Sequence, residues 1–157
     1  MKLALWSVGK AHDKQLATAI EAFTTRIQKY YTTEWHIIAP PKNAASLDVS
    51  TLKKQEGQLI LQQLQPQDYL VLLDEKGKML SSVDVANFIQ DQATSSTKRI
   101  VLLIGGAFGV DEPVRQRANM VWSLSRLVFP HMLVRLILAE QVYRACSIIR
   151  GEKYHHI

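Results

Sequence analysis

The sequence IVLLIGGAFG, residues 100–109, is an apolar run that stops at two adjacent glycines. A short apolar run bounded by glycines predicts a buried β-strand whose C-terminal end leads directly into a loop. In open α/β sheets, ligands bind at such loops, outside the carboxyl ends of the strands. We therefore expect residues 105–109 to form part of a ligand site.

Strand and helix patterns alternate on both sides of this stretch. Apolar segments bounded by Gly, Pro or polar residues predict strands at 2–9, 34–39, 69–73, 99–104 and 120–124. Helical spacing of apolar residues predicts helices at 14–31, from 48 or 50 to 64, from 81 to about 94, after Asp111, and at 131–149. This alternation favours an α/β fold with a mainly parallel sheet flanked by helices, and the length of 157 residues favours a single domain over 1–157.

Composition is that of a soluble globular protein, with 47% hydrophobic and 21% charged residues. No apolar run reaches the roughly 18 residues of a membrane span, and the first residues turn polar too soon for a signal peptide. The single cysteine, Cys146, excludes an internal disulfide and suits a reducing compartment. We expect a cytoplasmic protein with no membrane partner.

The basic excess lies entirely in the last third of the chain. Of 19 Lys and Arg and 14 Asp and Glu, seven cations and two acids follow Pro113, which leaves twelve of each before it. Six of those seven cations are arginine, which binds phosphate bidentately and stacks on bases. A basic surface that only promotes solubility explains the charge alone equally well.

The glycine loop fits neither of the common nucleotide motifs. Its adjacent glycines break the dinucleotide pattern GxGxxG, and no Gly-Lys-Ser/Thr follows as in a P-loop. Residues 73–74 and 123–129 end two other predicted strands, so three strand ends converge. Residues 124–130 combine apolar side chains with free backbone groups, a combination that suits an adenine ring. A tight turn without a ligand is the alternative for the glycine loop.

The last helix and the tail carry the remaining polar candidates. Glu140 and Arg144 are four residues apart and predict an ion pair, whereas Arg135 pairs with an acid or faces RNA. The histidines lack the spacing of a zinc site, so we expect no metal. Tyr154 can stack on a base and His155 can handle a proton near neutral pH, although a frayed end is the simpler interpretation of a terminus.

Several short segments together resemble one family across essentially the whole chain. They are LDEKGK at 73–78, LIGG at 103–106 with Gly109, WSLS at 122–125, FPH at 129–131, VR at 134–135, EQVYRA at 140–145, and Tyr154-His155. In these segments the sequence resembles the ribosomal RNA large subunit methyltransferase H family of the SPOUT class.

The resemblance implies a SPOUT-type fold with a C-terminal trefoil knot and a homodimer that shares its active site between subunits. It implies S-adenosylmethionine as methyl donor and N3-methylation of a pseudouridine in a 23S rRNA stem-loop on the assembled ribosome. Carried over by position, the donor contacts are Leu73, Gly105, Leu124, Ser125, Arg126, Leu127, Val128 and Phe129. After Tyr154-His155 the family leads us to expect a basic residue, and His156-Ile157 stands there instead.

On this interpretation, three residues carry the chemistry on the substrate side. His155 handles the N3 proton or positions the base, Tyr154 stacks on the base or hydrogen-bonds it, and Arg144, with Arg135 as a second candidate, holds phosphate or developing charge. Two alternatives remain open at this point. One is a non-catalytic RNA-binding or ribosome-assembly module on the same scaffold, and the other is a nucleotide-dependent enzyme of different chemistry.

Overall fold

Five strands form one sheet in the computed structural model, which describes residues 1–156 of the chain. The strands are β1 (Lys2–Val8), β2 (Thr32–Ile38), β3 (Tyr69–Met79), β4 (Arg99–Ile104) and β5 (Met120–Ser123), in the spatial order β2-β1-β4-β3-β5. Every pair of neighbours in this sheet is parallel, so the prediction of a mainly parallel α/β fold is confirmed. Ile157, the last residue of the tail, lies outside the described residues.

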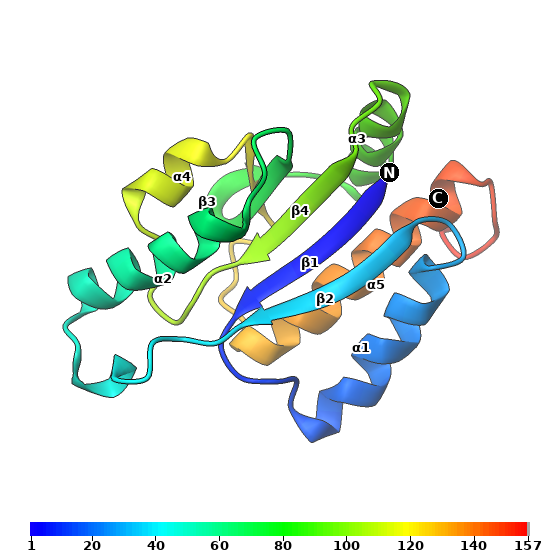
Figure 1. Cartoon of the computed structure of the whole chain (residues 1–157). Helices are drawn as coiled ribbons and strands as arrows, with labels where there is room; N and C mark the ends of the chain where they lie inside the picture. Colours follow the sequence, from blue (N-terminus) through cyan, green and yellow to red (C-terminus); the bar gives the residue numbers. More distant parts are fainter. Residues whose placement is uncertain (157) are drawn as a thin grey trace.

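Helices cover both faces of the sheet (Figure 1). They are α1 (Lys14–Ile27), α2 (Val49–Gln63), α3 (Ser82–Thr94), α4 (Glu112–Arg117) and α5 (His131–Ile149), with a 3₁₀ turn at Ala44–Ser46. Buried residues of α1, α3 and α5 pack on one face, and those of α2 and α4 pack on the other. Within residues 1–156, none of these helices combines the length and apolar content that a bilayer crossing requires.

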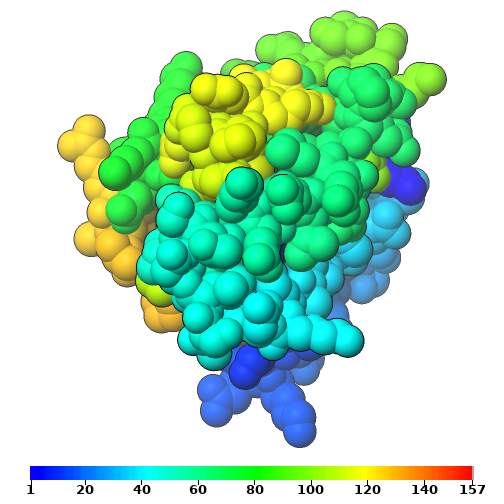
Figure 2. Space-filling view, turned by 60° about the vertical axis from the view of Figure 1, so that its left-hand side comes forward, coloured from blue at the N-terminus to red at the C-terminus, as the bar shows by residue number. Residues whose placement is uncertain are grey.

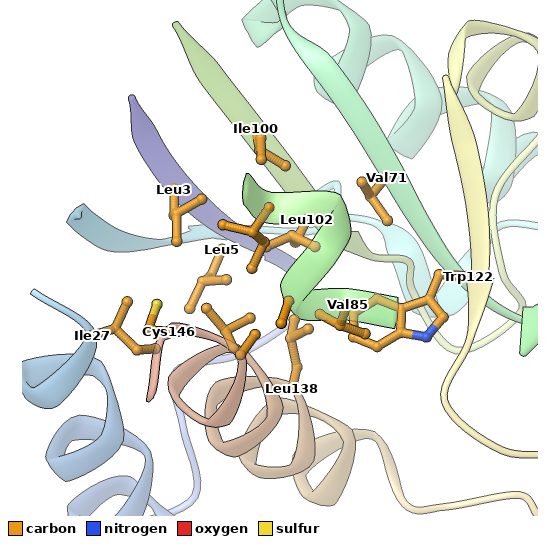
Figure 3. Packing of buried hydrophobic residues seen from close by; sticks show 14 of the residues in the cluster. Leu3, Leu5, Ile27, Val71, Val85, Ile100, Leu102, Trp122, Leu138 and Cys146 are labelled. Carbon is orange, nitrogen blue, oxygen red and sulfur yellow. The ribbon is translucent and has the colours of Figure 1, made fainter. Parts of the chain in front are cut away.

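Alternation along the strands divides the core into two layers. In β1, Leu3 and Leu5 point to the layer under α5, whereas Ala4 and Trp6 point to the layer under α2. Figure 3 shows Leu3, Leu5, Ile100, Leu102 and Leu138 gathered in the first layer. Burial of each large apolar side chain contributes about 1.5–3 kcal/mol to the stability of the folded chain, and such side chains are buried on both faces of the sheet. The central strands are therefore apolar in nearly every residue.

Three of the helices begin at polar caps that the sequence predicts. The Asp48 carboxylate accepts a hydrogen bond from the Thr51 N–H at 2.7 Å. Ser81 and Asp84 form the predicted capping box, in which each side chain accepts from the backbone N–H of the other residue. Asp111 caps α4 with a longer bond to the Val114 N–H. Such caps satisfy N–H groups that have no partner inside the helix.

The third strand is longer than the sequence predicts. β3 runs past Leu73 to Met79, and its pairing with β5 shifts register so that both Leu73 and Lys78 lie opposite Trp122. Gly77 makes this return possible, because a Cβ there would stand 2.6 Å from the carbonyl oxygen of Val121. The polar residues 74–77 therefore form a bulge between the two paired segments of β3. This bulge lies at the same end of the sheet as the glycine loop. The trefoil knot stays a prediction of the resemblance.

Candidate functional site

A cavity of about 720 Å³ opens at the carboxyl ends of β3, β4 and β5. Its volume lies within the range of small-molecule sites. The lining residues come from the three strand ends, α2, α4 and the start of α5, and they include Leu73, Asp74, Gly105, Gly106, Arg115, Leu124, Ser125, Leu127, Val128, Phe129 and His131. The structure thus brings together seven of the eight residues predicted to contact the donor. Arg126 is exposed and is not among the lining residues.

The glycine loop forms the floor of this cavity through its backbone. A Cβ on Gly106 would lie 2.6 Å from a carboxylate oxygen of Glu56, and one on Gly105 would lie 2.9 Å from Val110 Cγ1. The loop closes with a hydrogen bond from the Gly109 N–H to the Gly106 carbonyl at 3.0 Å. Glycine is needed at both positions because a side chain would push the loop away from α2 and from its own far end.

Two serines shape the loop after β5. The Ser123 hydroxyl donates to the Ser125 carbonyl at 2.9 Å, and the Ser125 hydroxyl accepts from the Leu127 N–H at 3.0 Å. The loop projects from the body of the molecule, orange in Figure 2, beside the green end of β3. Leu127 and Val128 are 69% and 82% exposed, and Phe108 across the cavity is 57% exposed. The mouth of the cavity is therefore apolar and uncovered in the single chain.

Another part of the cavity lining, where β3 and α4 meet, is charged. Arg115 of α4 forms an ion pair with Asp74, and the Asp74 carboxylate also accepts from the Lys76 N–H at 2.8 Å. Burial alone would raise the pKa of Asp74, but these two hydrogen bonds hold the pKa below its usual range. Asp74 is therefore a fixed negative charge at the cavity, where it can accept hydrogen bonds from the hydroxyl or amine groups of a ligand.

His131 connects α5 to the glycine loop. Its Nε2 lies 3.1 Å from the carbonyl oxygen of Gly105. Burial, followed by the nearby Arg135 charge, lowers the pKa of His131, so the imidazole is neutral at pH 7. Because a carbonyl only accepts, the proton of this neutral ring sits on Nε2. His131 therefore lines the cavity and also anchors the glycine loop.

Arg135 does not face RNA, so its assignment as a second phosphate-holding residue is wrong. Its side chain is fully buried, and it donates to the Ser7 hydroxyl at 3.0 Å and to His12 Nδ1 at 3.1 Å. It forms no ion pair with any acid among residues 1–156, and one Nη atom has no partner there. The residue lies below the surface because α5 is covered on several sides, and the Ser7 hydroxyl to which it donates lies 3.4 Å from Nε2 of His131.

The predicted catalytic residues form a second cluster near the C-terminal end of α5. Arg144 donates to Glu140 through Nε at 3.0 Å and to His155 Nδ1 through Nη1 at 3.1 Å. The Tyr154 hydroxyl donates to the same Glu140 oxygen at 3.0 Å. The expected Glu140–Arg144 ion pair is present, and the tail folds back onto the helix. Tyr154, His155 and Arg144 are thus brought together around Glu140, which accepts from Arg144 and Tyr154.

The geometry of this cluster defines which groups donate. Arginine only donates, so Nδ1 of His155 accepts, and a neutral His155 carries its proton on Nε2. Burial and the bond to Glu140 raise the pKa of Tyr154, so its hydroxyl keeps its proton at neutral pH. The bond to Glu140 raises the pKa of Arg144. The cluster therefore presents N–H donors and a phenol ring, held by a carboxylate.

The structure does not bring the cluster and the cavity together within one chain. His131 lines the cavity at the start of α5, whereas Arg144 lies near the end of the same helix. A helix rises about 1.5 Å per residue, so the two regions are about 20 Å apart along α5. No groups of three or more His, Cys, Asp or Glu side chains suited to a metal ion occur among residues 1–156.

Sequence reasoning missed Glu56 entirely and found only part of the role of Glu140. The i, i+4 spacing indicated a partner for Arg144, but no signal showed that Tyr154 would return to the same carboxylate. Glu56 is only 6% exposed beside Gly106, and burial raises its pKa. On its helix it occupies an inward-facing position, and only the close approach of the glycine loop gives it a role.

The chain belongs to the SPOUT methyltransferase family, since the family model described as "Predicted SPOUT methyltransferase" matches residues 1–155. Proteins named ribosomal RNA large subunit methyltransferase H are similar to it along nearly their whole length. That of Cytophaga hutchinsonii is 44% identical over 99% of this chain and 100% of the relative, and that of Bacteroides thetaiotaomicron is 40% identical over 99% of each.

A solved structure shows the same fold at low sequence identity. It is the tRNA (m1G37) methyltransferase from Aquifex aeolicus, with a TM-score of 0.55, 14% identity, and coverage of 100% of this chain and 76% of that chain. The SPOUT-type architecture of the sheet and helices is confirmed by this likeness and by the family match. The family match and the named relatives favour the methyltransferase interpretation over a non-catalytic module.

Proposed function

We propose that this chain is an S-adenosylmethionine-dependent methyltransferase that methylates N3 of a pseudouridine in a 23S rRNA stem-loop on the assembled ribosome. The observation that carries the proposal is the cavity, because residues of three strand ends surround one ligand-sized space in a chain of a methyltransferase family. The choice of rRNA as substrate rests on the names of the relatives, which are ribosomal RNA methyltransferases. Because ribosomes are the proposed substrate, we expect the reaction to take place in the cytoplasm.

The cavity fits a donor that has an adenosyl and an amino-acid part. Leu124, Phe129 and neighbouring apolar side chains provide faces for an adenine ring, and the backbone of 105–109 offers N–H and C=O groups at close range. Asp74 can accept from ribose hydroxyls or from an ammonium group. No metal ion is needed to hold such a ligand. The donor supplies an electrophilic methyl group on a positively charged sulfur.

The reaction is a transfer in line from sulfur to nitrogen. The N3–C bond forms as the S–C bond breaks, the electron pair of that bond goes to sulfur, and the N3 proton leaves to a base or to water. The enzyme mainly supplies proximity and alignment. His155 is proposed to handle this proton or to position the target nucleobase. With Arg144 on Nδ1, the Nε2–H of the neutral ring can donate to a carbonyl of the nucleobase, so this arrangement favours positioning, with water as the acceptor of the N3 proton. Tyr154 offers a ring for stacking.

A homodimer accounts for the separation of the two regions. We propose that the Tyr154–His155 tail of one subunit faces the cavity of the other, so that each active site is composite. The exposed Phe108, Leu127 and Val128 at the cavity mouth support this arrangement, because apolar side chains grouped on a surface mark an interaction site. The target base must be unpaired or extruded, since N3 lies on its pairing edge.

The test is methyl transfer from labelled S-adenosylmethionine to assembled ribosomes, separate subunits and naked 23S rRNA, with mass mapping of the product. We expect one methyl group per ribosome, on a pseudouridine, and little transfer to naked RNA. Calorimetry with S-adenosylmethionine distinguishes an enzyme from a binding module. An enzyme should bind the donor saturably and lose this binding in the Gly105→Trp variant, whereas a binding module should not bind it. Transfer to another base, or no donor binding by wild type, would refute the proposal.

A further inference from the structure

Three guanidinium groups lie over aromatic rings along the seam between α1 and α5, away from the cavity. Arg26 lies 5.5 Å from the centre of the Tyr143 ring, Arg150 lies 5.9 Å from that of Tyr30, and Arg144 lies 4.7 Å from that of Tyr154. Figure 1 shows α1 and α5 side by side, with the C-terminal turn against the end of both. We call the six residues the arginine–aromatic strip: Arg26, Tyr30, Tyr143, Arg144, Arg150 and Tyr154.

The three tyrosine rings of the strip lie next to one another, and hydrogen bonds hold two of them in place. Tyr143 is central, with the ring centres of Tyr154 at 4.7 Å and Tyr30 at 6.5 Å. The Tyr30 hydroxyl donates to Glu152 at 2.7 Å, and this bond raises the pKa of Tyr30 to about 12. The Tyr30 ring therefore stays neutral and fixed, and each ring of the strip has a guanidinium over it.

The charge of the strip is free to act outward. Arg26 and Arg150 are exposed, and neither forms an ion pair with an acid in residues 1–156. The two carboxylates in contact with the strip are already engaged: Glu140 accepts from Arg144 and Tyr154, and Glu152 accepts from Tyr30. A strip of oriented guanidinium groups suits phosphate, which arginine binds through two parallel N–H groups.

We propose that the arginine–aromatic strip is a docking surface for the RNA backbone on either side of the target nucleotide, with Arg26 and Arg150 binding phosphates. This inference rests on the proposed function. The strip includes Tyr154 and Arg144, which are proposed to contact the target nucleobase. RNA bound along the strip would therefore have its target nucleotide next to these residues. RNA fits better than an acidic protein segment because aromatic rings beside arginine also stack on unpaired bases.

The experiment compares two double variants that remove the same charge. Arg26→Ala/Arg150→Ala removes the two free guanidinium groups of the strip. Lys14→Ala/Lys54→Ala removes exposed cations at the far end of α1 and on α2, which lies across the sheet. Arg26→Lys/Arg150→Lys keeps the charge but loses the planar fork. None of these residues belongs to the proposed active site, so turnover at saturating ribosome reports on chemistry alone.

We expect Arg26→Ala/Arg150→Ala to raise KM for ribosomes about tenfold, with kcat and donor affinity within about twofold of wild type. The slope of log affinity against log salt should fall by about one for each phosphate that the variant no longer binds. The lysine control should match wild type, and the Arg-to-Lys variant should lie between. An unchanged KM and salt slope in the alanine variant would overturn the proposal, as would its loss of the dimer in light scattering, which would make the strip a contact between copies.

Failure of the proposed function would look different. If wild type transfers no methyl group to ribosomes, sedimentation with ribosomes at rising salt still tests the strip. Weaker co-sedimentation of the alanine variant than of the lysine control then supports RNA docking. Equal co-sedimentation of the two contradicts it. Loss of binding to an acidic polypeptide such as polyglutamate, with ribosome binding intact, would assign the strip to a protein partner and overturn the RNA proposal.

Discussion

The two ends of α5 carry two different kinds of site. At its start, the cavity is concave and combines loop backbone and apolar side chains with charged residues, which are the Asp74–Arg115 ion pair and the lining residues Lys53, Glu75 and Lys76. Near its other end, the tail cluster is a charged and aromatic surface in which Glu140 organises Arg144 and Tyr154. The first suits a small ligand recognised by shape, and the second suits a polyanion and a single base. The proposed function assigns donor recognition to the first end of α5 and substrate recognition to the second.

On the proposed function, the two regions are half-sites of one reaction. Because they lie about 20 Å apart along α5, the proposal requires that the methyl group passes between the cavity of one subunit and the tail of the other. Variants at one end should therefore affect one property and leave the other unchanged, and each prediction below tests that independence.

Arg144→Ala should have the largest effect, on turnover alone. Removal of the guanidinium leaves Glu140 and His155 without their shared partner, and loss of a preorganised charged donor reduces kcat by about 10²–10³-fold. Donor affinity, measured by calorimetry, should stay within about twofold of wild type. Arg144→Lys should restore little, because an ammonium cannot bridge the carboxylate and the imidazole as the planar fork does. A parallel loss of donor binding would show that the two regions are not independent.

Leu124→Ala should have the converse effect, on donor binding alone. Leu124 lines the cavity just after β5, and removal of its apolar side chain weakens donor binding about tenfold. At saturating donor, kcat should return to near the wild-type value. The matched control is Val83→Ala, which truncates a partly exposed apolar residue on α3, outside the cavity. Equal effects of both variants would mean that reduced stability, and not a missing ligand contact, explains the change.

A smaller effect should appear in the pH dependence of stability. Burial holds the pKa of His131 below its unfolded value of about 6.5, so below that pH the unfolded chain binds more protons. Stability therefore falls as pH drops from about 6.5 through the folded pKa. His12 has a lowered pKa from the same causes and acts in the same direction. His131→Gln, which can still donate to Gly105, should show a shallower fall in Tm between about pH 7 and pH 5; an identical fall would contradict the assignment.

The cavity could largely be predicted from sequence, because it follows from local patterns. The apolar run before Gly105 and the periodicity of the last helix predicted β4 and α5 with the observed bounds. Ligands bind at the carboxyl ends of parallel strands, and this rule predicted that the loops after β3, β4 and β5 would line one site. That rule does not say which side chains of a loop point inward, and Arg126 is the residue of the 124–129 run that does not.

The remaining features depend on contacts between distant parts of the chain. β3 extends through the polar residues 74–77 because it pairs again with β5, some forty residues later, after a shift in register. Arg135 is buried because Ser7 and His12, more than 120 residues away, accept its hydrogen bonds. The return of Tyr154 to Glu140 likewise has no local pattern. Such long-range polar pairings cannot be seen in periodicity, which reports only on which face is apolar.

Mixing two inactive variants tests most directly that each active site combines the cavity of one subunit with the tail of the other. Gly105→Trp, which displaces the glycine loop that lines the cavity, and Arg144→Ala, which disables the tail, are each checked for a wild-type unfolding transition and for dimerisation. They are then unfolded together, refolded and assayed on ribosomes. Random pairing places one intact composite site in each heterodimer, so about a quarter of wild-type activity should return. Activity no higher than the sum of the separate variants, with heterodimers present, would contradict the composite site.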